Sequence, residues 1–159
     1  MNDAATPQPT PDRGETAPEP LLDETVRELL DAAIAVMARS HSPYSNYPVG
    51  AAIRTTDGAT FVGCNVENAA YPEGTCAEAG AIAAMVAGTD GHPVISTIVT
   101  VTASTRAGSP CGGCRQKIRE FSDASTVVQC CTVEGLESTF TMDELLPDSF
   151  GPEDLLPTR

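Results

Sequence analysis

A run of apolar, largely β-branched residues in the second half of the chain constrains the fold most. Residues 93–103 read PVISTIVTVTA, and apart from three threonines and one serine every residue of the run is apolar. β-branched residues favour strands, and strands that are apolar along their whole length are normally buried on both faces of a sheet. The run therefore predicts a central, buried strand.

The chain on either side of this strand alternates between helical and extended patterns. Apolar residues at helical spacing, with Asp23 placed to act as the N-cap, predict a helix over 23–40. Two strands joined at Asp57-Gly58 are predicted within 49–67. The remaining predictions are a helix from about Cys76 to Val86, a helix within 109–123, strands over 125–133 and 136–142, and a mostly irregular segment over 143–159. This order predicts an α/β fold, a three-layer α/β/α sandwich with a mixed central sheet.

The first twenty residues differ from the rest in composition. They contain five of the 13 prolines and no Leu, Ile, Val or aromatic residue. Such a segment buries too little apolar surface to offset its ordering entropy, so residues 1–20 are predicted to form a disordered, acidic and proline-rich tail. The alternative is that this tail docks on a partner. Residues 21–159 are long enough for one domain with its own core.

Charge and cysteine content exclude several classes of protein. A formal net charge of −13, with only nine lysines and arginines, argues against nucleic acid as a partner but leaves small neutral ligands open. No apolar run approaches the ~20 residues of a membrane-spanning helix, and the first residues lack the features of a secretory signal. Six cysteines without such a signal favour reduced thiols or metal ligands over disulfides. We therefore expect a cytoplasmic protein without a membrane partner.

Two cysteines in the sequence PCGGC stand at the start of a predicted helix. Cys111 and Cys114 lie three residues apart, so both sulfurs can point at one ion, and the helix N-terminus favours their thiolate forms. On its own this spacing leaves three interpretations open. The pair could belong to a metal site such as half of a zinc ribbon, form a redox dithiol of the thioredoxin type, or have neither role.

A third cysteine, Cys76, opens another predicted helix and can supply a thiolate from a second helix N-terminus. Three protein ligands without an obvious fourth are typical of a catalytic zinc site, which keeps one position open for water. The other cysteines lie in apolar strand patterns and are predicted to be core residues, and both histidines are predicted to lie in loops: Cys64, Cys130, Cys131, His41 and His92.

A carboxylate lies beside this third cysteine in an otherwise small and apolar helix. Glu78 occurs two residues after Cys76, in the stretch TCAEAGAIAAM. A buried carboxylate is costly unless it is paired or takes part in chemistry, and this position allows Glu78 to exchange protons with a metal-bound water without ligating the metal. The alternative is an ordinary first-turn carboxylate that interacts with the helix dipole.

A Cys-x-Glu followed later by Pro-Cys-x-x-Cys is the signature of zinc deaminases. The chain resembles the cytidine deaminases, specifically the small homotetrameric kind with three cysteine ligands, from about residue 22 to residue 155. The resemblance depends on four blocks that occur in this order: SPYSNYPVGAA, GCNVENAAYPEGTCAE, SPCGGCRQKIREF and ELLPDSFGPEDL.

The resemblance implies a reaction and a metal site. Cys76, Cys111 and Cys114 match the family's zinc ligands, so one Zn²⁺ per subunit is expected. It implies hydrolytic deamination of cytidine and deoxycytidine at C4, giving uridine, deoxyuridine and ammonia in pyrimidine salvage. Glu78 matches the family's proton carrier, which serves N3 and then the departing amine. Carbonyl groups near Ser109 and Cys111 match contacts to the base.

The resemblance also implies residues that bind the nucleoside. Asn65 and Glu67 match the family's ribose-binding pair, although without the other blocks the sequence NVENAAYP favours simple turn chemistry. Tyr47 stands where the family usually has a base-stacking phenylalanine, and the Ala77 N–H matches a contact to the base. Phe150 matches an aromatic that reaches into a neighbouring subunit's site, so a homotetramer with shared sites is expected.

One position departs from the family's usual pattern. The family commonly has an arginine after the glutamate of CAE, which bonds to cysteine sulfur, whereas Ala79 follows Glu78 here. Three thiolates and Zn²⁺ sum to a net negative charge, so the remaining neutralisers are two helix N-termini and Arg115. We therefore expect Arg115 to contribute more to zinc retention and turnover than is usual in the family. Arg115 is predicted as a supporting residue of the site, and so is Tyr71.

Several alternatives stay open at this point. Within the same fold, the substrate could be a cytosine-bearing nucleoside antibiotic or a polynucleotide, although the ribose-binding pattern and the acidic charge favour the free nucleoside. From a different class, the chain could be a non-catalytic zinc-binding or redox module in which Glu78 is incidental.

Overall fold

The computed structural model describes residues 23–155, and residues 1–22 and 156–159 lie outside the described part of the chain. The predicted tail over 1–20 therefore falls outside it. Among residues 23–155, no helix is both long enough and apolar enough to cross a membrane.

A five-stranded mixed sheet forms the centre of the structure. Its strands lie in the order β2-β1-β3-β4-β5, and only β3 and β4 pair in parallel. The strands are β1 (Val49–Thr55), β2 (Thr60–Cys64), β3 (Ile95–Thr102), β4 (Ser122–Thr132) and β5 (Gly135–Thr141). The apolar run 93–103 supplies the middle strand, which confirms the prediction of a central strand.

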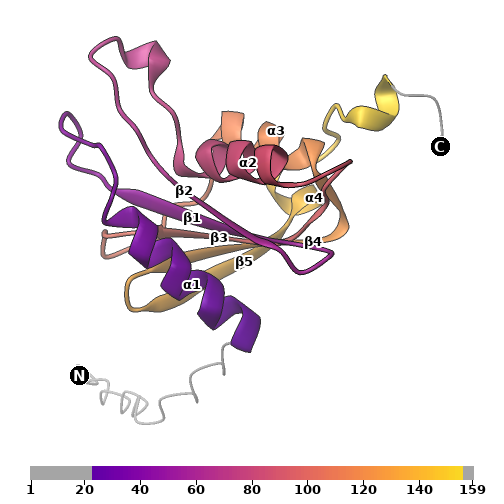
Figure 1. Cartoon of the computed structure of the whole chain (residues 1–159), viewed down its shortest axis with the longest axis horizontal. Coiled ribbons are helices and arrows are strands. Elements are labelled where there is room, and N and C mark those ends of the chain that lie inside the picture. The colour runs from indigo at the N-terminus through magenta and orange to yellow at the C-terminus, as the bar shows by residue number, and fades with distance from the viewer. Residues whose placement is uncertain (1–22, 156–159) are drawn as a thin grey trace, which may run out of the picture.

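Helices cover both faces of this sheet. Helix α1 (Glu24–Met37) lies on one face, and α2 (Ala77–Gly88), α3 (Gly112–Glu120) and α4 (Met142–Leu145) lie on the other (Figure 1). Two short 3₁₀ helices, Tyr71–Glu73 and Pro152–Asp154, lie in connecting segments. The three-layer α/β/α prediction is confirmed.

The C-terminal segment is more regular than the sequence predicted. Residues 143–159 were expected to be mostly irregular, but helix α4 forms where Thr141 and Glu144 make a reciprocal capping box. The Met142 and Leu145 side chains of this helix are buried against the sheet. A four-residue helix is too short to show a hydrophobic period, so the capping pattern was its only local signature.

Helix α1 follows directly from its sequence. The Asp23 side chain accepts a hydrogen bond from the Thr25 N–H, as expected for an N-cap. Its buried face packs on the sheet residues that point the same way, and these together form one core: Val26, Leu29, Leu30, Ala33, Met37, Ala52, Val99, Val101 and Cys131. This layer supports the sheet from the side opposite to the cysteine cluster.

The predicted hairpin between β1 and β2 is also confirmed. The two strands pair antiparallel, and Gly58 in the connecting turn has φ +91°. Only glycine adopts this left-handed conformation without strain, which explains the Asp57-Gly58 turn.

The backbone of helix α2 packs very close to β2, which is an edge strand of the sheet. A Cβ atom added to Gly63 of β2 would lie 2.5 Å from the Ala77 carbonyl oxygen, inside any allowed contact. Because Gly63 has no side chain and α2 presents small residues such as Ala77 and Ala81, the helix backbone packs directly on the strand. This contact fixes where the first turn of α2 begins.

Candidate metal centre and active site

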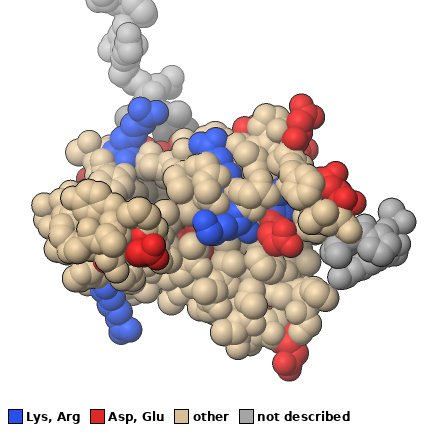
Figure 2. Space-filling view, turned by 90° about the horizontal axis from the view of Figure 1, so that it is seen from above, with Lys and Arg blue, Asp and Glu red and all other residues tan. Residues whose placement is uncertain are grey.

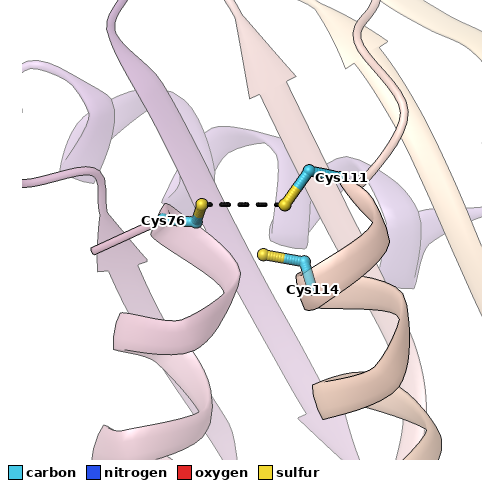
Figure 3. Close-up of side chains that lie close together, drawn as sticks. All are labelled: Cys76, Cys111 and Cys114. Atoms are coloured by element: carbon cyan, nitrogen blue, oxygen red, sulfur yellow. Dashed lines mark hydrogen bonds between the residues drawn. The ribbon is translucent and has the colours of Figure 1, made fainter. Parts of the chain in front are cut away.

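Two helix N-termini bring three cysteines together. Cys76 is the N-cap of α2, Cys111 is the N-cap of α3, and Cys114 lies in the first turn of α3. The three Sγ atoms all lie within 4.8 Å of one another, and the sulfurs of Cys76 and Cys111 are 3.9 Å apart. Figure 3 shows the three side chains pointing toward a common centre between the helices.

These distances fit a metal site and exclude a disulfide. A disulfide needs sulfurs about 2.05 Å apart, and all three cysteines are free. Tetrahedral zinc with Zn–S bonds of about 2.3 Å places its sulfur ligands about 3.8 Å apart, close to the 3.9 Å observed. The donor set is therefore that of a zinc site with three protein thiolates and one further position.

The protonation of the three thiols differs from one to the next. Burial raises the pKa of Cys114 far above its usual value, and the Glu78 carboxylate adds to this effect. Burial also raises the pKa of Cys76. At Cys111, burial raises the pKa, but hydrogen bonds from the backbone N–H of Cys114 and from the neighbouring thiols outweigh this effect and lower the pKa overall. The depressed pKa expected from the helix N-terminus is thus found at Cys111 only, and three thiolates at one point require a cation.

The remaining cysteines lie elsewhere in the fold. Cys130 and Cys131 are fully buried in β4, on opposite faces of the sheet, and Cys64 is half-buried at the end of β2. Their prediction as core residues is confirmed for the first two and in part for Cys64.

Glu78 lies in the first turn of α2, beside the cysteine cluster. Only 5% of its surface is exposed, and among the described residues no hydrogen bond to its carboxylate is formed. It lines the same pocket as Cys76 and Cys111. The carboxylate thus faces the pocket without a hydrogen-bond partner among the described residues, and this position favours contact with a ligand there.

A pocket of about 550 Å³ extends from the cysteine cluster along the ends of the strands. It brings together predicted site residues that are far apart in the sequence, namely Tyr47, Asn65, Glu67, Tyr71, Cys76, Ala77, Glu78 and Cys111. Three predicted residues, Cys114, Arg115 and Phe150, do not line it. The pocket is large enough for a small organic ligand with its reactive end at the cysteines.

Asn65 holds the wall of this pocket in place. Its Oδ1 accepts hydrogen bonds from the Val49 N–H (2.8 Å) and the Ser40 hydroxyl (2.5 Å), and its Nδ2 donates to the Tyr47 carbonyl (2.9 Å). These bonds fix the backbone on both sides of Pro48. Asn65 therefore holds the backbone of Tyr47 in place.

Glu67 holds the neighbouring loop in place in a similar way, by hydrogen bonds to its backbone. Its Oε2 accepts hydrogen bonds from the N–H groups of Tyr44 (2.9 Å) and Ser45 (3.2 Å). Bonds from Ser45 and Tyr44, together with His41 nearby, hold the pKa of Glu67 below its usual value. The other oxygen, Oε1, receives no hydrogen bond from the described residues, so it is available to a ligand hydroxyl.

Aromatic side chains surround the open end of the pocket. Tyr47 is 42% exposed, and Tyr71 packs edge-to-face on Tyr44 with ring centroids 5.9 Å apart. Both Tyr44 and Tyr71 are exposed on the surface. Rings of this kind present flat apolar faces with a polar tip, which suits an amphipathic ligand.

Arg115 acts on the loop that precedes Cys111. Its guanidinium donates to the Pro110 carbonyl (2.8 Å), the Leu145 carbonyl (2.9 Å) and the Ser109 hydroxyl (3.2 Å). Among the described residues it forms no hydrogen bond to a cysteine sulfur. The arginine therefore joins α3 to the loop at Ser109-Pro110 and to the end of α4, and its predicted part in balancing the thiolate charge stays a prediction.

Phe150 is exposed (59%) and lies away from the pocket of its own chain. Its carbonyl accepts a hydrogen bond from the Gln116 side chain (2.9 Å), which ties the C-terminal segment to α3.

On the face that carries α2 and α3, basic side chains lie beside acidic ones (Figure 2). One such pair joins Arg119 and Glu153.

Sequence reasoning missed part of the pocket floor. Thr100 and Thr102 are buried at the end of β3 and line the pocket beneath the cysteines. Two threonines at positions i and i+2 of an otherwise apolar central strand share one face, and this was the only available indication. Gly108 and Ser109, in the loop after β3, complete the same wall.

Comparisons with known proteins agree with this geometry. The family model "Cytidine and deoxycytidylate deaminase zinc-binding region" matches residues 23–131. A cytidine deaminase from Sporosarcina psychrophila is 37% identical over 130 residues, which cover 82% of this chain and 94% of that protein. One from Mycoplasma genitalium is 38% identical over 116 residues, covering 72% and 87%.

Solved structures give the same result. The structure of cytidine deaminase from Burkholderia pseudomallei superposes with a TM-score of 0.71 at 38% identity, covering 78% of this chain and 98% of that one. That of cytidine deaminase from Mycobacterium leprae gives 0.66 at 37% identity, covering 79% and 100%. With its three-cysteine metal centre, the chain belongs to the cytidine deaminase family of zinc-dependent hydrolases.

Proposed function

We propose that this enzyme hydrolyses free cytidine and deoxycytidine to uridine and deoxyuridine, with release of ammonia, as a step of pyrimidine salvage. The observation that supports this most directly is the position of Glu78. Its buried carboxylate has no partner among the described residues and lines a pocket that ends at three converging thiols. Such a carboxylate beside a zinc site is suited to proton transfer between water and substrate.

In this proposal the metal and the chain divide the chemistry. Zinc held by Cys76, Cys111 and Cys114 supplies, when bound, a Lewis acid that makes water a competent nucleophile near neutral pH. Glu78 takes the proton released as water adds to C4 and delivers it to N3. It then carries a proton to the amine, which leaves as ammonia while the C4 carbonyl of uridine forms.

The walls of the pocket orient the nucleoside. The Ala77 N–H, one of the unpaired donors at the start of α2, is assigned to the base carbonyl. Tyr47 is assigned to stacking on the pyrimidine ring. Asn65 and the free Oε1 of Glu67 are assigned to the ribose hydroxyls, and Tyr71 supports the open end. The fixed loops described above mean that little ordering entropy is lost when the nucleoside binds.

The assembly and location of the enzyme are part of the same proposal. Phe150 and Tyr71 are large exposed aromatics on one chain. Aromatic side chains are enriched at subunit interfaces, which supports a homotetramer with shared sites. We also assign residues 21–159 to a single catalytic domain, and the cytoplasm as its location because its cysteines are free thiols.

A single comparison tests the activity. Purified zinc-loaded protein is mixed with cytidine, and the loss of cytidine absorbance is followed for wild type and Glu78→Gln. We expect Glu78→Gln to retain zinc, measured by elemental analysis, and to lose activity by about 10²–10⁴-fold. Retained zinc with no turnover in either protein would instead indicate a non-catalytic zinc module.

Two further substrates separate the alternatives within the fold. A cytosine-bearing nucleoside antibiotic and a single-stranded oligodeoxycytidine are assayed beside cytidine at equal concentration. The proposal requires the highest kcat/KM for the free nucleosides. Preference for either alternative would contradict the substrate assignment while leaving the zinc chemistry intact.

A further inference from the structure

A second cavity adjoins the catalytic pocket behind the loop that precedes Cys111. It has a volume of about 460 Å³, far above the ~30 Å³ that one water occupies, and we call it the side pocket. Its polar lining comes from that loop and from β5, and the residues used below are Ser104, Arg106, Glu137 and Ser138. None of these four lines the catalytic pocket.

The two cavities share one wall. Tyr47, Gly108 and Ser109 line both the catalytic pocket and the side pocket. Gly108 has no side chain there, and a Cβ atom added to it would lie 3.1 Å from the Tyr47 hydroxyl, tighter than an ordinary contact. The absence of a side chain at this position therefore leaves the wall thin beside the tyrosine hydroxyl.

The order of the strands shows which edge of a bound base faces the side pocket. Asn65 and Glu67, assigned to the ribose, follow β2 at one edge of the sheet. The cysteines lie at the start of α2, which packs on β2 and β1, and at the start of α3, which packs on β4, and Glu137 and Ser138 lie on β5 at the opposite edge. In cytosine the atom across the ring from the ribose-bearing N1 is C4, which carries the exocyclic amine. With the ribose at the β2 edge and C4 at the cysteines, as in the proposed function, the amine points toward β5 and the side pocket.

The side pocket offers both a donor and an acceptor. The Arg106 guanidinium forms no hydrogen bond or ion pair among the described residues. Glu137 uses Oε2 to accept from the Ala107 N–H (2.7 Å), which leaves Oε1 free. Two serine hydroxyls, of Ser104 and Ser138, add further partners. A group that both donates and accepts hydrogen bonds, such as an alcohol, matches this lining better than an alkyl chain or a bare charge.

We propose that the side pocket receives a small hydroxyalkyl substituent on the exocyclic amine, so that the enzyme also hydrolyses N4-hydroxyalkyl cytidines. This activity rests on the proposed deamination at the same zinc site. Water adds to C4 and the C4–N4 bond breaks as before. The nitrogen leaves with its substituent as a primary amine, so N4-(2-hydroxyethyl)cytidine and water give uridine and 2-aminoethanol.

The test compares three substrates with zinc-loaded wild type: cytidine, N4-(2-hydroxyethyl)cytidine and N4-propylcytidine. The last two carry substituents with the same number of heavy atoms and differ only in the hydroxyl. We expect uridine and 2-aminoethanol in equal amounts, and a kcat/KM at least 10-fold higher for the hydroxyethyl than for the propyl compound. Turnover of cytidine without turnover of the hydroxyethyl compound overturns the side-pocket proposal alone, and no turnover of cytidine overturns the proposed function as well.

Variants of the side pocket locate the effect. Ser138→Leu takes up part of the cavity with an apolar side chain and removes a hydroxyl, and it is expected to lower kcat/KM for the hydroxyethyl compound at least 10-fold, with cytidine changed less than 3-fold, whereas Ser138→Ala keeps the space. Arg106→Ala, on an exposed loop, is expected to raise KM for the hydroxyethyl compound and leave cytidine unchanged, which gives a second result should Ser138→Leu fold poorly. Equal turnover of the hydroxyethyl compound by wild type, Ser138→Leu and Arg106→Ala overturns the assignment.

Discussion

The two helices that supply the cysteines are held on the sheet by different forces. The start of α2 is fixed by backbone packing, because Gly63 lets the Ala77–Ala81 turn lie directly on β2. The start of α3 is fixed by polar side chains of the helix, which reach a loop and the C-terminal segment. A closely packed contact has no room for an added atom, whereas a set of hydrogen bonds can lose one partner and keep the others. The metal centre thus depends on two supports that should respond differently to mutation.

Loss of one cysteine from either helix should abolish the metal centre. Cys76→Ala removes the α2 ligand and Cys114→Ala an α3 ligand, and both are expected to reduce zinc from one per chain to a small fraction, with turnover lost. Three thiolates are already the minimum for the site, so two bind too weakly. Zinc analysis and the cytidine assay measure this, with Cys64→Ala as the control. Normal zinc content in either variant would exclude that cysteine as a ligand.

Added volume at Gly63 should test the packing support of α2. Gly63→Ala forces a Cβ into the α2 backbone and is expected to lower the free energy of unfolding by about 1–3 kcal/mol, measured by urea denaturation. The control is Gly112→Ala at the start of α3, where nothing lies within 4 Å of the added Cβ, so little change or a slight gain in stability is expected. Equal effects of the two substitutions would show that α2 is not held by close packing.

Arg115 should test the polar support of α3 and separate it from a charge effect. Arg115→Gln removes both the charge and the three-way hydrogen bonding, and we expect zinc affinity or turnover to fall by about 10–100-fold. Arg115→Lys keeps the charge but cannot reach all three partners. If zinc affinity or turnover falls about as much in Arg115→Lys as in Arg115→Gln, the main role of Arg115 is to hold the loop and the C-terminal segment by hydrogen bonds. Recovery in the lysine variant identifies charge instead, and Lys117→Gln, an exposed change on the same helix, serves as control.

The smallest expected effect concerns the loop held by Glu67. Because hydrogen bonds depress its pKa below the usual 4.5, the carboxylate contributes stability that is present above pH 4.5 and is lost as the pH falls through its lower, folded-state pKa. The Tm difference between wild type and Glu67→Gln should therefore narrow below about pH 4.5. Thermal unfolding between pH 3 and 7 measures it, and a difference that does not change with pH would contradict the hydrogen-bonding account.

Some features could be predicted from local sequence because local forces produce them. The Asp23 cap, the Gly58 turn and the apolar β3 each depend on residues within a few positions of one another. Helix α4 escaped prediction because four residues are too few to show a period. The place of Thr100 and Thr102 in the pocket was not predicted, because threonine is common in strands whether or not it lines a pocket.

The sequence by itself determined the order of the longer helices and the strands and the chemical groups available to the site, since both depend on local pattern and residue type. Only the tertiary structure decided that Cys76 and Cys111, 35 residues apart, converge while Cys130 and Cys131 remain in the core. It also decided that Arg115 bonds to carbonyl groups and that a second cavity adjoins the first. These contacts join segments distant in sequence. Their geometry follows from strand order and close packing, which no local pattern encodes.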